Sequence, residues 1–258
     1  PPSGWGDPDC LGVSPLFFIR SRLQVRQEKA TGTMERHRDQ DFEQIRQSLL
    51  RMGGLVERMI SEAMAALVER DSSRAQAVIR TDAEVDQLEK ELDNACYAVL
   101  ALQQPTAVDL RFLVAVMKIS TDLERMGDSA VNVAQAVEIL NQEPPLKPYI
   151  DLPRLAVITQ EMVRDALDSF VRRDARAAFE VCRRDDEVDA LYRQLFRELL
   201  TYMMEDPRTV ARALHLLLIA RNYERIADHA TNIGEDVVFY VEGRDIRHLA
   251  PVDISERK

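Results

Sequence analysis

The stretch MISEAMAALVERDSSRAQAV, residues 59–78, has a second copy later in the chain: MVRDALDSFVRRDARAAFEV, residues 162–181. In each copy, apolar residues recur at the spacing of a helix, stop at a short polar segment, and then resume. That segment is RDSSRA in the first copy, where Asp71 or a serine is suited to cap a following helix. The stretch therefore encodes two helices and the turn between them, and it does so twice.

The similarity continues beyond these two helices. RTDAEVDQL at residues 80–88 parallels RRDDEVDAL at residues 183–191, and QQPTAV at 103–108 is echoed by EDPRTV at 205–210. The offset between the copies is 103 residues at first and 100 residues in the last helix, as a small change in the turn would produce. Each copy holds three long helices, so the sequence predicts an all-α fold of two tandem three-helix bundles with antiparallel long helices.

The boundaries of the two copies follow from the apolar spacing. We expect the first three helices over about residues 38–69, 74–101 and from near Pro105 to about 141. The segment NQEPPLKPYIDLP, residues 141–153, has four prolines in 13 residues, which is typical of a linker. The expected domains are therefore a first bundle at 34–141, a linker at 142–153, a second bundle at 154–242 and a tail at 243–258.

The first 33 residues differ in composition from the rest of the chain. They do not begin with methionine, they contain the single tryptophan, Trp5, and they hold four of the 9 glycines. We expect residues 1–33 to be a disordered leader or a non-native extension that precedes Met34, and we assign them no function.

Composition limits the class of protein. With 46% hydrophobic and 30% charged residues, the chain is expected to be a folded soluble protein. A net charge of -10 disfavours general affinity for nucleic acid or anionic membrane and suits cations or basic partner surfaces. The cysteines Cys10, Cys96 and Cys182 form no CxxC pair, as expected of reduced thiols in a cytoplasmic protein. No apolar run approaches the roughly 20 residues of a membrane-spanning helix, so direct membrane insertion is not expected.

An acidic motif occurs once in each copy. DLERMGDSAVN at residues 122–132 and NYERIADHATN at residues 222–232 share the pattern E-R-x-x-D-x-x-x-N. Positions i, i+4 and i+8 share one side of a helix. That stripe holds Glu124, Asp128 and Asn132 in the first copy and Glu224, Asp228 and Asn232 in the second. At about 100° per residue the stripe lies nearly opposite the apolar stripe, so we expect these side chains to face solvent or a partner surface.

The second helix of each copy carries a matching acidic pair. Asp82 and Asp86 lie in DAEVD, and Asp185 and Asp189 lie in DDEVD. The second and third helices of a three-helix bundle are antiparallel neighbours, so the two pairs in each copy are expected to converge. Carboxylates with an amide oxygen form an oxygen-only site that suits Mg²⁺, Mn²⁺, Ca²⁺ or iron rather than structural zinc. The alternative is a solvated acidic face without a metal.

The sequence offers little support for catalysis. It contains no Glu-x-x-His motif of helical di-iron proteins, no glycine-rich phosphate loop and no nucleophile elbow. His229 follows Asp228 directly, which turns it off the acidic stripe. We therefore assign no catalytic residue and expect a protein that is not an enzyme. Two alternatives stay open: a helical-bundle metalloenzyme with a carboxylate-bound di-metal site, and a metal-free acidic scaffold for protein interaction.

The repeated acidic pairs, the duplicated helices and the ending VVFYVEGRDIRH at residues 237–248 together resemble the PhoU family of phosphate-uptake regulators. The resemblance covers about residues 34–248. The family motif (E/D)xxxD fits Glu124 with Asp128 and Glu224 with Asp228 best, and the pairs in DAEVD and DDEVD also fit.

The resemblance implies a function with which the acidic composition is compatible but which that composition does not show. It implies that the motif residues bind a divalent or multinuclear metal, such as iron, Mn²⁺ or Mg²⁺, on the bundle surface. It also implies a cytoplasmic homodimeric adaptor between a phosphate ABC transporter ATPase and a sensor histidine kinase. Such an adaptor restrains phosphate uptake and starvation signalling when phosphate is plentiful.

Overall fold

The computed structural model describes the backbone of residues 15–247 and the side chains of residues 39–247. The chain divides into two units, residues 1–44 and residues 45–258, which are described separately. The described backbone of the first unit is helical and belongs to α1 (Pro15–Val68). The predicted helix start near residue 38 is therefore wrong. Residues 20–37 are rich in Arg, Gln, Glu and Lys, which favour helix but leave no clear apolar stripe to mark one.

The expectation of a disordered leader falls partly outside the described residues. Residues 1–14 are not described, and residues 15–33 lie within α1. Whether this extension is native stays a prediction.

The described part of the second unit, residues 45–247, contains the rest of α1 and five further α-helices. These are α2 (Ser72–Leu102), α3 (Ala107–Leu140), α4 (Asp151–Arg172), α5 (Ala175–Glu205) and α6 (Val210–Glu242), with a short 3₁₀ helix η1 (Pro207–Thr209) before α6. The part of the chain that is described contains no strand. The all-α prediction and the repeat of three helices are confirmed.

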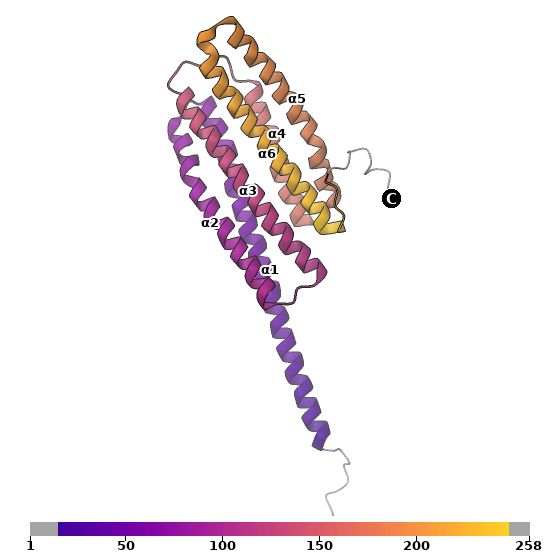
Figure 1. Ribbon diagram of the computed structural model, residues 1–258. Coiled ribbons are helices and arrows are strands. Elements are labelled where there is room, and N and C mark those ends of the chain that lie inside the picture. The colour runs from indigo at the N-terminus through magenta and orange to yellow at the C-terminus, as the bar shows by residue number, and fades with distance from the viewer. Residues whose placement is uncertain (1–14, 248–258) are drawn as a thin grey trace, which may run out of the picture. The chain divides into compact units, whose positions relative to one another are not determined.

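The helices of the second unit are arranged around the pair α3 and α6. Figure 1 shows these two helices side by side, with α2 next to α3 and α5 next to α6. Helix α4 contacts both α5 and α6. Helix α1 reaches the second repeat as well, since the Tyr223 hydroxyl donates a hydrogen bond of 2.8 Å to the Ile60 carbonyl. The central helices α3 and α6 are therefore packed on more than one side.

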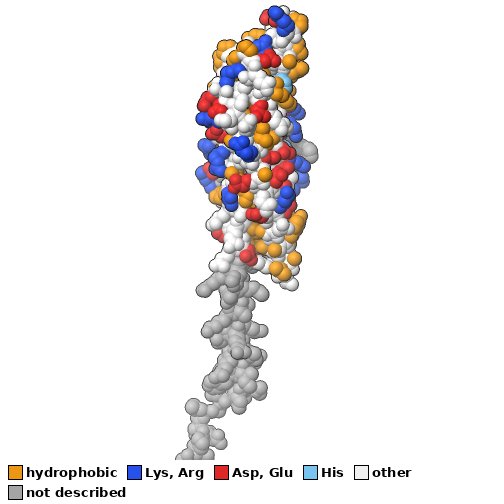
Figure 2. Space-filling model, turned by 90° about the vertical axis from the view of Figure 1, so that its left-hand side faces the viewer, with side chains coloured by type: hydrophobic (Ala, Val, Ile, Leu, Met, Phe, Trp, Pro, Cys, Tyr) orange, Lys and Arg blue, Asp and Glu red, His pale blue; other side chains and the backbone are white. Residues whose placement is uncertain are grey.

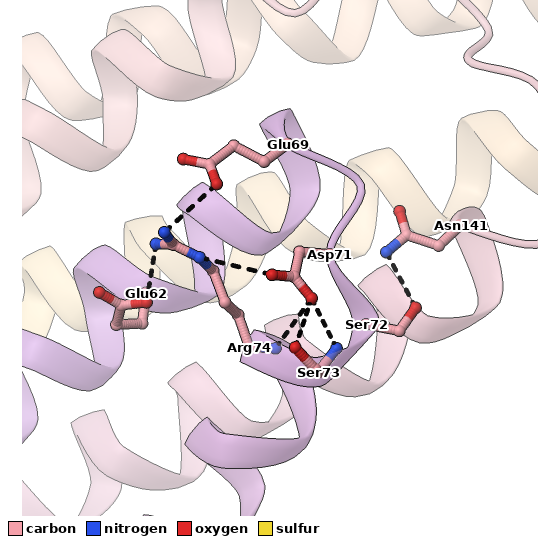
Figure 3. A network of polar contacts seen from close by, with 7 residues as sticks. All are labelled: Glu62, Glu69, Asp71, Ser72, Ser73, Arg74 and Asn141. Atoms are coloured by element: carbon pink, nitrogen blue, oxygen red, sulfur yellow. Dashed lines mark hydrogen bonds and ion pairs between the residues drawn. The ribbon is translucent and has the colours of Figure 1, made fainter.

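The turn between the first two helices is built as its sequence suggests. Figure 3 shows Asp71 accepting hydrogen bonds from the backbone amides of Ser73 and Arg74 as the N-cap of α2. The Arg74 guanidinium forms ion pairs with Glu62 and Glu69 of the preceding segment. In the second repeat, Asp174 caps α5 in the same way. The equivalent caps hold the two hairpins in the same local geometry.

A proline lies in the first turn of the second repeat, and a glycine follows its last helix. Helix α4 begins at Asp151, and Pro153 lies in its first turn, where a missing N–H costs nothing. Lys147 of the linker is buried and forms an ion pair with Glu198 of α5. Helix α6 ends at Glu242, followed by Gly243 in the left-handed region with φ 71°. No helix in residues 39–247 is long and apolar enough to cross a membrane.

Candidate functional site

The acidic side chains of α2 and α3 form a cluster, here called the first acidic groove. Asp82 of α2 is close enough to Asp128 of α3, and Asp86 of α2 to Glu124 of α3, to act on one another electrostatically. Burial, and then the negative charges of Asp86 and Asp128, raise the pKa of Asp82. Burial, followed by Asp128, Glu89 and Asp86, raises the pKa of Glu124. The structure therefore brings the two predicted acidic pairs of the first repeat together.

The second acidic groove lies between α5 and α6 and repeats this arrangement. Burial, followed by the charges of Asp228 and Asp189, raises the pKa of Asp185 to about 6. Burial and Asp228 also raise the pKa of Glu224, against the opposing effect of Arg221. Burial raises the pKa of Asp228, which Arg221 and His229 counteract. Like charges thus converge in both grooves, as the duplicated motif predicted.

Two carboxylate oxygens in the second groove have no partner. Asp185 Oδ1 and Glu224 Oε2 are buried from solvent without a hydrogen bond. The other oxygen of Glu224 forms an ion pair with Arg221. Buried acceptors left unpaired are costly, because they lose water without gaining a substitute. The second groove therefore offers ligand oxygens that nothing in the described chain satisfies.

The exposure of the motif residues corrects the expectation from helical periodicity. Asp128 is exposed, Asp228 keeps an exposed surface although its carboxylate is partly desolvated, Glu124 is half-buried, and Glu224 is only 7% exposed. The prediction that the whole stripe faces solvent is therefore wrong for Glu224 and only partly right for Glu124. The reason is the central place of α6, which contacts α3, α4 and α5. A single apolar stripe marks one packed face of such a helix and misses the others.

The two motif asparagines do not behave alike. Asn132 is half-buried on α3. Asn232 is exposed, and its amide nitrogen donates to Asp122 Oδ1 of α3 at 3.4 Å. The structure therefore directs the Asn232 amide toward α3 rather than toward the second acidic groove. A ligand role for either asparagine stays a prediction.

A polar seam between α3 and α6 was not predicted from the sequence. His229 Nδ1 lies 2.8 Å from Asp122 Oδ1, and Lys118 Nζ lies 2.6 Å from Asp236 Oδ1. These residues are 107 and 118 positions apart in the chain. His229 does lie off the acidic stripe, but it is a partner of Asp122 rather than a simple boundary residue. No local pattern could have identified either pair, because both form only when α3 packs against α6.

The grooves supply suitable ligand atoms for a hard cation, but they are not assembled around one. In the side-chain conformations of residues 39–247, no three Asp, Glu, His or Cys residues are arranged to hold a metal ion. The oxygen-only donor set and the two unpartnered oxygens do fit a divalent cation of that kind. Binding would require the carboxylates of a groove to rotate toward one another.

Comparison with known proteins gives a consistent result. A family model described as the PhoU domain matches residues 49–137 and again 152–237. The chain is 40% identical over 226 residues to a phosphate-specific transport system accessory protein PhoU homolog of Pseudomonas putida, covering 87% of this chain and 88% of that protein. The PhoU homolog of Aquifex aeolicus is 43% identical over 208 residues, covering 81% of this chain and 94% of that protein.

Solved structures agree with the sequence comparison. The crystal structure of PhoU from Pseudomonas aeruginosa superposes with a TM-score of 0.78 at 42% identity, covering 80% of this chain and 99% of that chain. The phosphate transport system regulatory protein PhoU from Streptococcus pneumoniae gives 0.74 at 30% identity, covering 80% and 98%. With both repeats matched by the same family model, the chain belongs to the PhoU family.

Proposed function

We propose that the chain is a cytoplasmic, non-enzymatic accessory regulator of a phosphate transport system. It would link a phosphate ABC transporter ATPase to a sensor histidine kinase and restrain phosphate uptake and starvation signalling when phosphate is plentiful. The names of its relatives, which include transport accessory and regulatory proteins, support this role. The observation that carries it is the pair of equivalent carboxylate grooves, one in each repeat, in which burial and then neighbouring carboxylates raise the pKa of Asp82 and of Asp185.

In this proposal each groove binds a divalent or multinuclear metal ion, such as iron, Mn²⁺ or Mg²⁺. The carboxylates of the first groove (Asp82, Asp86, Glu124 and Asp128) and of the second (Asp185, Asp189, Glu224 and Asp228) would hold it. Burial raises the pKa of Asp185 most, and the charges of its neighbours add to that effect. A bound cation would offset both and would satisfy the unpartnered oxygen of Asp185. The metal would organise a charged docking surface, and the protein would act as a homodimer.

Metal binding is tested by replacing Glu124, Asp128, Glu224 and Asp228 with alanine. We expect elemental analysis of the purified variant to show loss of the bound metal, with helicity unchanged by circular dichroism. Two exposed acids outside the grooves, Glu91 and Glu205, give the matched control when replaced with alanine. Equal metal content in the two variants would show that the grooves are not the site.

The adaptor role is tested by affinity purification from cells grown at high and at low phosphate. We expect the transporter ATPase or the sensor kinase to co-purify, in amounts that depend on phosphate. Recovery of neither protein, together with measurable turnover of a small molecule, would refute the adaptor role and support the metalloenzyme alternative.

A metal-free scaffold is the second candidate function. It is favoured by the absence, in residues 39–247, of three side chains already arranged around a cation position. In that case the carboxylates would meet basic side chains of a partner directly. Co-purification of the partners with a metal-depleted protein, prepared with a chelator, would select this candidate.

A further inference from the structure

An apolar surface lies beside the second acidic groove and is separate from the carboxylates proposed to bind metal. It is formed by Ile139 of α3, Phe196 and Leu200 of α5, and Leu214 and Leu218 of α6, here called the apolar platform. Each of these five side chains is between 43% and 52% exposed. Figure 2 views the molecule from the side opposite α5, and on that face charged side chains lie across the middle with hydrophobic side chains above and below them.

The helix register brings the platform residues to one place. Helices α5 and α6 are antiparallel, with the Arg221 guanidinium 5.8 Å from the Tyr192 ring and Cys182 Sγ 3.7 Å from the Thr231 carbonyl. Continuing that register toward the turn puts Phe196 and Leu200 beside residues 213–217 of α6.

The register of α3 against α6 completes the platform. The pairs Lys118–Asp236 and Asp122–Asn232 fix that register, and it places Ile139 next to Leu214. In Figure 1 the α5–α6 turn and the C-terminal end of α3 lie at the same end of the second unit.

The first repeat does not contain this surface. By the offsets of the two repeats, Phe196 corresponds to Asp93 and Leu218 to Lys118, and Lys118 is engaged with Asp236. In the second repeat the Arg221 guanidinium lies over the Tyr192 ring, and in the first repeat Glu89 stands at the position of Tyr192. At the positions of Phe196 and Leu218 the first repeat carries charge where the second carries apolar area, whereas its equivalent of Leu200 is the exposed Tyr97. The two repeats share a fold but present different chemistry at this place.

Arginines border the platform and provide its charge. Arg197 follows Phe196 on the outer side of α5, and Arg225 lies two turns beyond Leu218 on α6. Both are exposed, and the charge of Arg225 also acts on Asp228 of the second groove. Arg221 lies between the platform and the acidic groove, where it pairs with Glu224. Exposed apolar residues next to arginine are characteristic of protein interfaces.

We infer that the apolar platform is a docking site for an amphipathic helix of a partner protein, with large apolar side chains on one face and acidic side chains beside them. The apolar face would lie on the exposed side chains of the platform, and the acidic residues would pair with Arg197 and Arg225. A second copy of the chain fits less well, because a two-fold contact of the platform with itself sets the same arginines against one another. This inference rests on the adaptor role proposed above and names the surface that would serve it.

The test uses the full chain and a synthetic helical peptide of about 18 residues, with leucines at three- and four-residue spacing and glutamates on either side. A second peptide has lysine in place of each glutamate. Binding is measured by fluorescence anisotropy. We expect the glutamate peptide to bind at least about tenfold more tightly than the lysine peptide.

Variants locate the binding. Phe196→Asp and Leu218→Lys install the residues of the first repeat, and each is expected to weaken the glutamate peptide about tenfold or more. Both sites are exposed, so circular dichroism should report an intact fold. Leu110→Ser, at an exposed apolar residue outside the platform, is the matched control and should bind as the parent does.

Three results would overturn the inference. They are equal binding of the two peptides, unchanged binding by Phe196→Asp, and a dimer in sedimentation velocity that Phe196→Asp converts to a monomer. The last would show that a second copy covers the platform. Because the peptide assay uses the purified chain alone, its failure is separate from a failure of the co-purification that tests the adaptor role.

Discussion

Asp185 is a groove residue whose ionised side chain lowers the stability of the folded protein. It is half-buried on α5, its Oδ1 lacks a partner, and burial together with Asp228 and Asp189 raises its pKa to about 6. The folded-state pKa lies above the ordinary aspartate value of 3.8, so the folded protein binds this proton more tightly than the unfolded chain does. The ionised form therefore lowers stability, fully above about pH 6 and progressively less as the pH falls toward 3.8.

Asp185→Asn is accordingly expected to stabilise the metal-free protein at neutral pH. A gain of about 1 kcal/mol is expected at pH 7.5, after allowing for solvent screening of a side chain that is only half-buried. The gain should shrink as the pH is lowered toward 4.5. Urea unfolding in the presence of a chelator measures it, with Asp186→Asn on the exposed side of the helix as control. A less stable variant at pH 7.5 would contradict the assignment.

At the scale of the helix, the N-caps of α2 and α5 give a matched pair. The Asp71 carboxylate accepts hydrogen bonds from the backbone amides of Ser73 and Arg74. At the equivalent place in the second repeat, the Asp174 carboxylate accepts from the amides of Arg176 and Ala177. Replacing either aspartate with alanine is expected to cost about 1 kcal/mol, because backbone N–H groups of the first turn lose their acceptor. Thermal unfolding followed by circular dichroism measures the loss. Asp168→Ala removes only an exposed ion pair with Arg172 and should cost less than about 0.5 kcal/mol.

The close approach of α5 and α6 depends on a glycine. A Cβ at Gly234 would lie 2.8 Å from the Ala178 carbonyl oxygen and 3.0 Å from Cys182 Sγ. Gly234→Ala should therefore destabilise the protein by about 1–3 kcal/mol, since a backbone oxygen cannot move aside without shifting the helix. A Cβ at Gly54 meets only Arg58 Nη1, at 3.9 Å, so Gly54→Ala should be neutral or stabilising in the same denaturation assay. Similar values for both would argue against the tight contact.

At the scale of the whole second unit, contacts across the repeats join them into one folding body. The rings of Phe112 in α3, Phe170 in α4 and Tyr240 in α6 contact one another with centroids 5.6–5.8 Å apart. The two phenylalanine rings are stacked, and the Tyr240 ring meets Phe112 edge-on. The ion pair of Glu57 with Arg164 joins α1 to α4. Calorimetry of this part of the chain is therefore expected to show one cooperative transition rather than one for each repeat.

Tyr223→Phe tests that connection directly. The Tyr223 hydroxyl is buried and donates to the Ile60 carbonyl, so its loss is expected to cost about 1 kcal/mol. The midpoint of the single calorimetric transition should fall as a whole. Tyr97→Phe, at an exposed ring, is the control and should leave the midpoint unchanged. A shift confined to one of two resolved transitions would show that the repeats unfold separately.

The spacing of apolar residues and the internal repeat together predicted much of the architecture. The repeat of residues 59–78 at 162–181 predicts three helices written twice, and the prolines of residues 141–153 mark the connection between them. It also placed the acidic pairs on adjacent helices, and the structure brings Asp82 together with Asp128, and Asp185 with Asp228. These results depend on spacing within a helix and on the antiparallel order of neighbours, which are local properties of the chain.

The sequence by itself determined which helices form, how they repeat and which side chains share a helical face. Only the tertiary structure decided that Glu224 is buried, that His229 meets Asp122, and that apolar side chains of three helices adjoin one groove and not the other. The physical reason is that α3 and α6 pack on several sides at once. Burial and pairing between residues about one hundred positions apart depend on the mutual packing of whole helices, which a period of 3.6 residues does not encode.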